Sequence, residues 1–169
     1  MKSLVIYFSR ADENYNVGFI DIGNTEVIAE YIKDITDADL FKVEPLVPYS
    51  KNYYTCINEA KERTQNHNAP IKENIPDIKS YDVIYIGSPI YWGTMPEELF
   101  TALKNVDFTD KNIRVFTTHE GSGLANVVND VRKICVGANV IDSIAIQGST
   151  VLSSKGKVEN WINNYEKNN

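Results

Sequence analysis

Apolar runs of strand length recur along the chain and alternate with segments of helical periodicity. The runs at 3–8, 81–89 and 112–118 are nearly continuous Val, Ile, Tyr and Phe, which is typical of strands buried on both faces. Two further runs lie at 39–45 and 139–148. The pattern predicts strands at these ranges.

The segments between the runs carry helical spacing. In residues 24–36 apolar side chains recur at i, i+3, i+4, i+7 and i+8, which places them on one stripe of a helix. Weaker forms of the pattern predict helices at 53–65, 95–105, 123–135 and 156–167. Strands that alternate with helices form a parallel sheet with right-handed crossovers. The predicted fold class is therefore α/β, a doubly wound five-stranded parallel sheet with helices on both faces.

The chain shows no internal repeat, low-complexity tract or linker that would divide it. We therefore expect residues 1–169 to form a single domain. The polar stretch 64–80 is expected to be a surface connection into the third strand.

The composition narrows the class of protein. Of 169 residues, 43% are hydrophobic and 24% charged, as in an ordinary soluble globular protein. The formal net charge of -6 disfavours nucleic acid and anionic membranes as partners. The apolar run at the N-terminus is too short for a signal peptide, and no stretch reaches transmembrane length. We therefore expect a cytoplasmic protein with no nucleic-acid or membrane partner.

The two cysteines, Cys56 and Cys135, are too few and too far apart for a disulfide framework. Each falls in a predicted helix, so we expect buried thiols. The histidines, His67 and His119, form no cluster with zinc-binding spacing. The sequence predicts no metal site.

Ligands of doubly wound sheets bind beyond the carboxyl ends of the strands, so the strand exits are the informative segments. Ser9 follows the first strand, and Gly23-Asn24-Thr25 opens the first helix. A helix N-terminus offers unpaired N–H groups to phosphate, and the two hydroxyl groups can donate further hydrogen bonds. The alternative is an ordinary helix cap that binds nothing.

Two aromatic residues, Tyr91 and Trp92, follow the third strand on a loop punctuated by proline and glycine. Such rings are suited to cover a flat ligand, and the alternative is that they pack onto the protein's own surface. The loop after the fourth strand, "TTHEGSGLANV" at 117–127, exposes glycine amides before another helix. It lacks the last glycine of the dinucleotide fingerprint, so a Rossmann NAD site is not expected. Together the three loops suit a molecule with a phosphate at one end and a flat heterocycle at the other.

These motifs, "LVIYFSR…GNTEVIAEYI", "YDVIYIGSPIYWGTMP" and "VFTTHEGSG", resemble those of flavodoxins, and more narrowly of short-chain, flavodoxin-like FMN proteins. The resemblance spans essentially the whole chain. It implies strand order 2-1-3-4-5, tightly held non-covalent FMN, and electron transfer. It also implies a set of cofactor-binding residues: for the phosphate Ser9, Arg10, Asn24 and Thr25; for one side of the isoalloxazine Pro89, Ile90, Tyr91, Trp92, Gly93 and Thr94, with Trp92 stacking; for the other side Thr118, His119, Glu120, Gly121, Ser122 and Gly123.

The sequence departs from the flavodoxin pattern in two places. An insertion, about 11–21, separates Ser9 from Gly23-Asn24-Thr25. It is interpreted either as a lid over the phosphate and ribityl chain or as a surface excursion. The loop after the fourth strand also lacks the tyrosine that flavodoxins commonly stack there, and His119 is its only ring. A pH-dependent role of His119 beside the flavin is a hypothesis.

Three functions are compatible with this topology. The first is a low-potential electron carrier, steered by its acidic surface to redox partners with basic docking surfaces. The second is an FMN-dependent NAD(P)H oxidoreductase that acts on quinones or similar small acceptors through the more open flavin face. The third, a receiver-like signalling domain, is disfavoured because Asp12-Glu13 lie in the insertion and the third strand ends in Ser88-Pro89.

Overall fold

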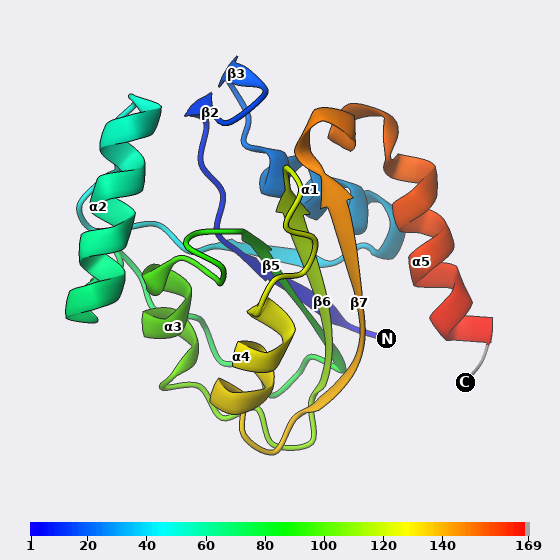
Figure 1. Cartoon of the computed structure of the whole chain (residues 1–169). Coiled ribbons are helices and arrows are strands. Elements are labelled where there is room, and N and C mark those ends of the chain that lie inside the picture. The colour runs from blue at the N-terminus through cyan, green and yellow to red at the C-terminus, as the bar shows by residue number, and fades with distance from the viewer. Residues whose placement is uncertain (168–169) are drawn as a thin grey trace.

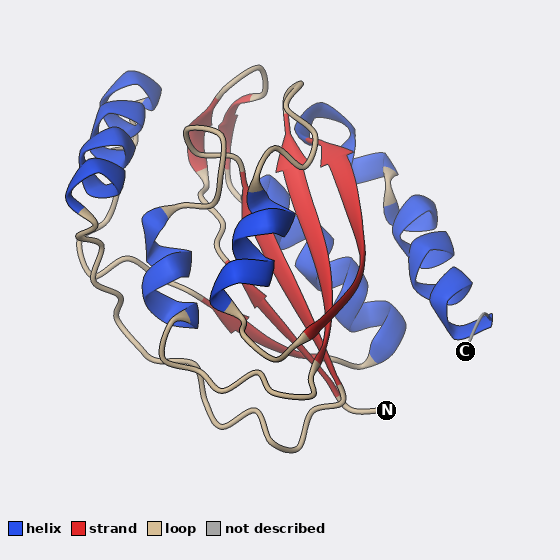
Figure 2. Cartoon of the chain, turned by 60° about the horizontal axis from the view of Figure 1, so that its bottom comes forward, coloured by secondary structure: helices blue, strands red, loops and turns tan. Residues whose placement is uncertain are grey.

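The computed structural model describes residues 1–167 and has a central sheet of parallel strands (Figures 1 and 2). These strands are β1 (Ser3–Tyr7), β4 (Asp39–Lys42), β5 (Val83–Pro89), β6 (Asn112–His119) and β7 (Asn139–Gln147). They are hydrogen-bonded in the order β4-β1-β5-β6-β7, which is 2-1-3-4-5 when only the strands of this sheet are counted. The predicted fold class and strand order are confirmed.

The helices follow the predicted periodicity. They are α1 (Asn24–Thr36), α2 (Tyr53–Asn66), α3 (Glu97–Leu103), α4 (Val127–Ile134) and α5 (Lys155–Lys167), with a 3₁₀ helix, η1 (Gly148–Ser153), before α5. The fourth helix begins later than predicted, because Gly123 and Ala125 have positive φ angles of 60° and 42° that do not fit a right-handed helix.

The central strands are apolar throughout because they are buried on both faces. Leu4 and Ile6 of β1 pack into one cluster with α3 and α4, whereas Val5 and Tyr7 pack into another with α1 and α5. Figure 2 shows these helices on opposite sides of the sheet. Alternate side chains of a strand point to opposite faces, so one continuous apolar run serves two cores.

A glycine in the middle of the sheet makes room for an aromatic ring. Gly87 of β5 is paired with Phe116 of β6. A Cβ atom at Gly87 would lie 2.0 Å from Cζ of Phe116, so the ring lies across the backbone of β5. Phe116 is fully buried in this position.

The connection between α2 and β5 is only partly a surface segment. It contains no helix or strand of the sheet, but Ile75 and Ile78 are buried in the core beside α3. Cys56 and Cys135 are free and buried, as predicted. Within residues 1–167, no helix has the length and apolar character needed to cross a membrane.

The insertion folds as a β-hairpin, with β2 (Asp12–Asn14) antiparallel to β3 (Gly18–Ile20). Asn16 and Gly18, at the turn, have positive φ angles of 64° and 70°, a conformation that asparagine and glycine adopt readily. Figure 1 shows the hairpin beyond the carboxyl edge of the sheet, near the first turn of α1.

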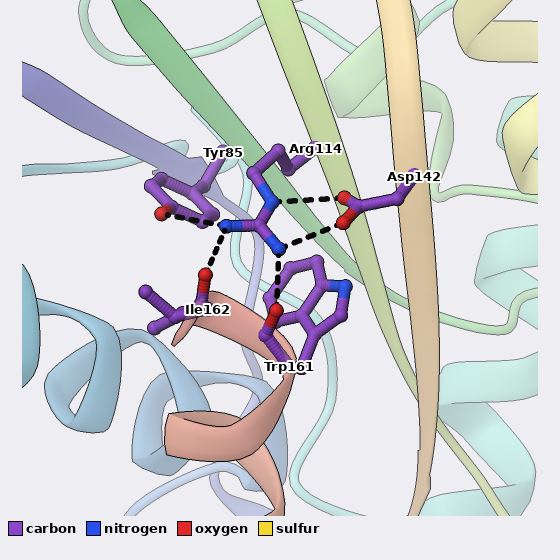
Figure 3. A network of polar contacts seen from close by, with 5 residues as sticks. All are labelled: Tyr85, Arg114, Asp142, Trp161 and Ile162. Atoms are coloured by element: carbon purple, nitrogen blue, oxygen red, sulfur yellow. Dashed lines mark hydrogen bonds and ion pairs between the residues drawn. The ribbon is translucent and has the colours of Figure 1, made fainter. Parts of the chain in front are cut away.

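A buried arginine joins the sheet to α5 (Figure 3). Nε and Nη2 of Arg114 donate to the two carboxylate oxygens of Asp142, over 2.8 and 2.7 Å. The remaining donors reach the hydroxyl of Tyr85 and the carbonyls of Trp161 and Ile162. Because the guanidinium is satisfied on all sides, this cluster is a structural tie and not a ligand site.

Candidate cofactor site

A cavity of about 360 Å³ lies at the carboxyl edge of the sheet. Three of its walls are the strand exits after β1, β5 and β6, and the fourth is α2. The insertion contributes Asn14 and Tyr15. The cavity brings together most of the predicted site residues: Ser9, Arg10, Asn24, Thr25, Pro89, Ile90, Tyr91, Trp92, Thr118, His119, Glu120 and Ser122. It is not lined by the remaining four, Gly93, Thr94, Gly121 and Gly123.

One end of the cavity is formed by the exit of β1 and the start of α1. Oγ of Ser9 accepts a hydrogen bond from the amide of Glu26 over 3.0 Å, which leaves the hydroxyl proton of Ser9 able to donate. Oγ1 of Thr25 lies 2.8 Å from Oγ1 of Thr118, so α1 and β6 meet through two buried hydroxyl groups. The insertion thus leaves the strand exit and the helix start in contact.

Gly23 shows how closely these two segments approach. A Cβ atom at Gly23 would lie 2.1 Å from Oγ of Ser9 and 2.7 Å from the carbonyl oxygen of Arg10. Gly23 is also the N-cap of α1 and provides no side-chain cap; the amide of Glu26 is taken by Ser9, whereas those of Asn24 and Thr25 stay open to a ligand. Backbone amides, hydroxyl groups and the positive end of a helix dipole together fit a phosphate group.

Arg10 is used differently from the expectation. Its terminal nitrogens donate to backbone carbonyls, with Nη1 bound to Glu13 and Nη2 bound to Ser50 and Lys51. Nε is buried and has no partner within residues 1–167. Most of the guanidinium therefore holds the insertion and residues 50–51, and the unpartnered, buried Nε is a donor that can serve a phosphate.

The loop after β5 forms a tight turn at the other end of the cavity. The amides and carbonyls of Tyr91 and Thr94 bond to each other over 2.8 and 3.2 Å. The central residues, Trp92 and Gly93, have φ angles of 53° and 81°, as in a type I′ turn. Positive φ is strained for tryptophan, and its indole N–H donates to the carbonyl of Ile57 in α2 over 2.9 Å.

The two aromatic residues of this loop behave differently. Tyr91 packs edge-on against Phe8 and Tyr49 at 5.6 and 5.7 Å, so it belongs partly to the core. Burial raises the pKa of its phenol well above the ordinary value. Trp92 remains 54% exposed at the mouth of the cavity. Tyr91 thus follows the packing alternative drawn from the sequence, and stacking on a ligand stays a prediction for Trp92.

The loop after β6 closes a further side. His119 is half-buried and its Nδ1 accepts from the amide of Gly121 over 2.9 Å, while Oε2 of Glu120 accepts from Asn16 at the hairpin tip over 3.0 Å. The start of η1 supports this loop from behind: a Cβ atom at Gly148 would lie 2.3 Å from Oε1 of Glu120. The pH-dependent role of His119 stays a hypothesis.

The sequence reasoning missed the wall formed by α2. It contributes Tyr53, Cys56, Ile57 and Ala60. Their spacing of i, i+3, i+4 and i+7 marks one face of a helix, on a segment that is otherwise polar. This short apolar stripe was the available signal, but a core-facing stripe has the same spacing.

A buried carboxylate ties α2 to α3. Glu98 has a fully buried side chain, and its Oε1 lies 2.7 Å from Nη1 of Arg63 in α2. Its Oε2 accepts from the hydroxyl of Tyr49 over 2.9 Å. The guanidinium of Arg63 also stacks 3.8 Å from the centre of the Tyr49 ring. These contacts place the cavity face of α2 relative to the core.

The residues fit a ligand with a phosphate and a planar ring. One end of the cavity holds amides, hydroxyl groups and the free Nε of Arg10. The other end holds the aromatic and apolar side chains of the Tyr91–Thr94 turn and α2. Within residues 1–167, no group of three or more His, Cys, Asp and Glu side chains could hold a metal ion.

Comparison with known proteins gives the same family. The flavodoxin family profile matches residues 2–165. A flavodoxin from Haemophilus influenzae is 26% identical over 149 residues, which cover 82% of this chain and 72% of that protein.

Solved structures share the fold. A putative flavoprotein from Bacteroides uniformis has a TM-score of 0.76 and 22% identity, covering 96% of this chain and 97% of that one. A flavoprotein from Lactobacillus acidophilus, solved in complex with FMN, has a TM-score of 0.64 and 23% identity, covering 92% and 98%. Oxidised flavodoxin 2 from Bacillus cereus has a TM-score of 0.61 and 19% identity, covering both chains in full. Because the family profile matches nearly the whole of this chain, the chain belongs to the flavodoxin family of FMN-binding proteins.

Proposed function

We propose that this protein is a cytoplasmic, low-potential electron carrier that works with FMN in the cavity described above. The observation that carries the proposal is the pairing of a helix start without a side-chain cap with a strained aromatic turn across one cavity. FMN supplies the redox chemistry when bound, and the protein binds it, orients it and tunes it.

Most donors at the phosphate end are neutral, and Arg10 is the one charged side chain among the residues assigned there. We assign the phosphate to the amides of Asn24 and Thr25 at the start of α1 and to the hydroxyl groups of Ser9 and Thr25. Nε of Arg10, buried and without a partner within residues 1–167, adds a donor from a charged side chain. Neutral donors at a helix N-terminus bind an anion well because their dipoles already point at it.

The turn at Tyr91–Thr94 provides the group that can hold a proton on the flavin. The carbonyl of Gly93 accepts from the amide of Asn126 over 3.0 Å and is therefore tied to the segment before α4. The carbonyl of Trp92, in the preceding peptide, is the remaining acceptor of the turn centre. Gly93 has no Cβ to oppose a change of φ, and even an added Cβ there would meet nothing within 4 Å, so the Trp92–Gly93 peptide is suited to turn. We assign the N5 proton of the flavin to this carbonyl.

The surroundings disfavour added negative charge. The chain has a formal net charge of -6, and the carboxylate of Glu120 borders the cavity. Charge repulsion in a partly buried site lowers the affinity of the site for an electron, which makes the reduced protein a strong donor. The same acidic surface favours redox partners with basic docking surfaces.

A stepwise anaerobic reduction of the FMN-loaded protein tests the proposal. The visible spectrum is followed after each addition of reductant. A carrier takes up its two electrons in separate one-electron steps, which the spectra resolve. Direct passage to the fully reduced form would contradict the carrier and support an FMN-dependent NAD(P)H oxidoreductase of quinones or similar acceptors. No feature of the cavity within residues 1–167 favours that alternative.

A paired substitution tests the phosphate assignment. Replacing Ser9 by Ala and Thr25 by Val removes two hydroxyl groups and is expected to weaken FMN binding by about 1 kcal/mol for each hydrogen bond lost. Riboflavin, which has no phosphate, serves as the control ligand and is expected to bind both proteins equally well. An unchanged dissociation constant for FMN would remove Ser9 and Thr25 from the phosphate site.

A further inference from the structure

The insertion is bound to the start of α2 along its first strand. The amide of Glu13 donates to the carbonyl of Lys51 over 3.3 Å. Oε2 of the same Glu13 accepts from the amide of Tyr53, the first residue of α2, over 2.8 Å. The rings of Tyr15 and Tyr53 lie 5.9 Å apart. The hairpin therefore meets α2 through its backbone, a carboxylate and a ring.

Arg10 fastens both partners to the exit of β1. Its guanidinium donates to the carbonyl of Glu13 in the hairpin and to the carbonyls of Ser50 and Lys51 before α2. Arginine offers several donors in a fixed planar arrangement, so one side chain holds two segments in a defined relation. This accounts for a guanidinium that lies in the cavity wall yet points mostly at backbone.

Helix α2 is only lightly packed on the core, and near its N-terminus Glu59 accepts from the amide of Ser50 and Ile57 accepts from Trp92. Of its 14 residues only Cys56 and Ala60 are buried. The tie to Glu98 is made by Arg63, in the last turns of the helix. Asn52 caps the N-terminus of α2, and the first turn of the helix contains no acidic residue. The carboxylate of Glu13 supplies the missing negative charge at this end of the helix dipole.

We propose that the insertion builds the cavity through α2: Glu13 and Arg10 are positioning residues that fix α2 as the wall facing the flavin ring. This inference rests on the proposed function. The α2 residues belong to the ring end of the cavity, because the indole of Trp92 donates to the carbonyl of Ile57 and Cys56 lines the cavity together with Tyr91. A loose α2 therefore lowers affinity for the ring itself, since only the fraction of molecules with α2 in place binds well.

The competing view is a lid, in which the hairpin covers the phosphate and ribityl chain. Its support is the hydrogen bond from Asn16 at the hairpin tip to Glu120 across the cavity. The two views differ in which part of the ligand depends on the hairpin for its binding. A lid acts on the phosphate and the ribityl chain, whereas a positioned α2 acts on the isoalloxazine ring.

Three flavins separate these views when titrated into the full-length protein: FMN, riboflavin without the phosphate, and lumiflavin without phosphate or ribityl chain. We expect Glu13→Ala to weaken all three by the same factor, about tenfold, the usual cost of one hydrogen bond to a charged group. We expect Glu13→Gln to recover part of the affinity, because its carbonyl still accepts from Tyr53. Asp21→Ala, at an exposed acid of the same insertion, is the charge control and is expected to leave all three constants unchanged.

Hydrogen exchange reports the positioning directly. We expect the amides of residues 53–55 to exchange about tenfold faster in Glu13→Ala without ligand, while the amides of β5 and β6 keep their protection. A general loss of stability would instead speed exchange in the sheet as well. Asn16→Ala, which cuts the hairpin tip from Glu120, is expected to change lumiflavin binding little.

The outcomes are distinct. A loss confined to FMN and riboflavin, or a larger effect of Asn16→Ala than of Glu13→Ala, would overturn the inference in favour of a lid. Unchanged affinity for all flavins despite faster exchange in α2 would also overturn it. If the unaltered protein binds none of the flavins, the proposed function itself fails.

Discussion

Two buried arginine–carboxylate pairs lie on opposite faces of the sheet, and they have different roles. In the pair of Arg114 with Asp142 the arginine side chain is 1% exposed and the carboxylate 29%. In the pair of Arg63 with Glu98 the carboxylate is 0% exposed and the arginine 14%. Each pair is completed by tyrosine, through Tyr85 in the first and Tyr49 in the second.

The difference lies in what each pair joins. Arg114 connects two neighbouring strands of the sheet to α5, and all of these belong to the core. Arg63 connects the core to α2, a helix with two buried residues and a face on the cavity. The first pair therefore supports the stability of the whole fold, whereas the second determines where one wall of the cofactor site lies.

The largest effect is expected from Arg114→Met. It leaves Asp142 and two carbonyls of α5 without their donor, which typically costs about 3 kcal/mol or more of unfolding free energy. FMN affinity of the folded protein should stay the same, because no atom of this cluster borders the cavity. Chemical denaturation measures the first quantity and FMN titration the second. Wild-type stability, or a lost FMN site in folded protein, would contradict the contrast.

Glu98→Gln should affect both quantities. It leaves Arg63 without its counter-ion, and we expect the free energy of unfolding to fall by about 2 kcal/mol. FMN affinity is expected to fall about tenfold as α2 loosens. Glu97→Gln is the matched control on the same helix: the Glu97 side chain is 11% exposed, but its partner His67 is 82% exposed, and an ion pair open to solvent contributes less than a buried one. Equal effects of the two substitutions would show that the buried pair does not position α2.

Gly23→Ala tests a wall that is made of backbone and depends on neither pair. The added methyl group collides with Ser9 and Arg10, and such overpacking usually costs about 1–3 kcal/mol. We expect FMN to bind at least tenfold more weakly, with a smaller loss for riboflavin. Gly156→Ala, where a Cβ meets nothing within 4 Å, is the control. Equal losses for both ligands would place the damage outside the phosphate site.

The smallest effect concerns thiol labelling, which sharpens the contrast. Burial raises the pKa of both thiols, from 9.0 to about 12 for Cys135, while for Cys56 the charge of Arg10 offsets part of the shift. The folded protein thus holds these protons. Stability due to Cys135 is complete below pH 9 and is lost as the pH rises toward 12.

At pH 8 we expect slow labelling of both cysteines. Glu98→Gln should speed labelling of Cys56 alone, and FMN should slow it again. Arg114→Met should speed both equally through global unfolding. Mass spectrometry after timed exposure to a maleimide measures the rates. If Glu98→Gln speeds the labelling of Cys135 as much as that of Cys56, the two arginine–carboxylate pairs do not have separate roles.

The fold could be predicted because the signals of the buried strands are redundant. In β5, continuous apolar residues, a following Pro-Gly loop and the next helical stripe all indicate one strand of a parallel sheet. Boundaries were less certain where backbone conformation decides them. Because Ala125 has a positive φ angle, α4 begins after it, and the alanine side chain gives no sequence signal of that conformation.

The candidate site was predictable at the strand exits and not beyond them. Gly23-Asn24-Thr25 and Tyr91-Trp92 carry their chemistry in the residue types themselves. The direction of the Arg10 side chain depends on where residues 50–51 lie, which is a matter of tertiary structure. The role of α2 depends likewise on Glu98, which lies 35 positions after its partner Arg63. The burial of Glu98 is visible only in the fold.

The contact of Gly87 with Phe116 restricts which substitutions this sequence can accept during evolution. With a Cβ at Gly87 predicted to lie 2.0 Å from the ring, neither position can change freely while the other stays the same. An alanine or larger residue at 87 requires a smaller side chain at 116, and a lost ring at 116 leaves a void that a larger residue at 87 fills. Descendants of this chain should therefore exchange volume between the two central strands in paired steps.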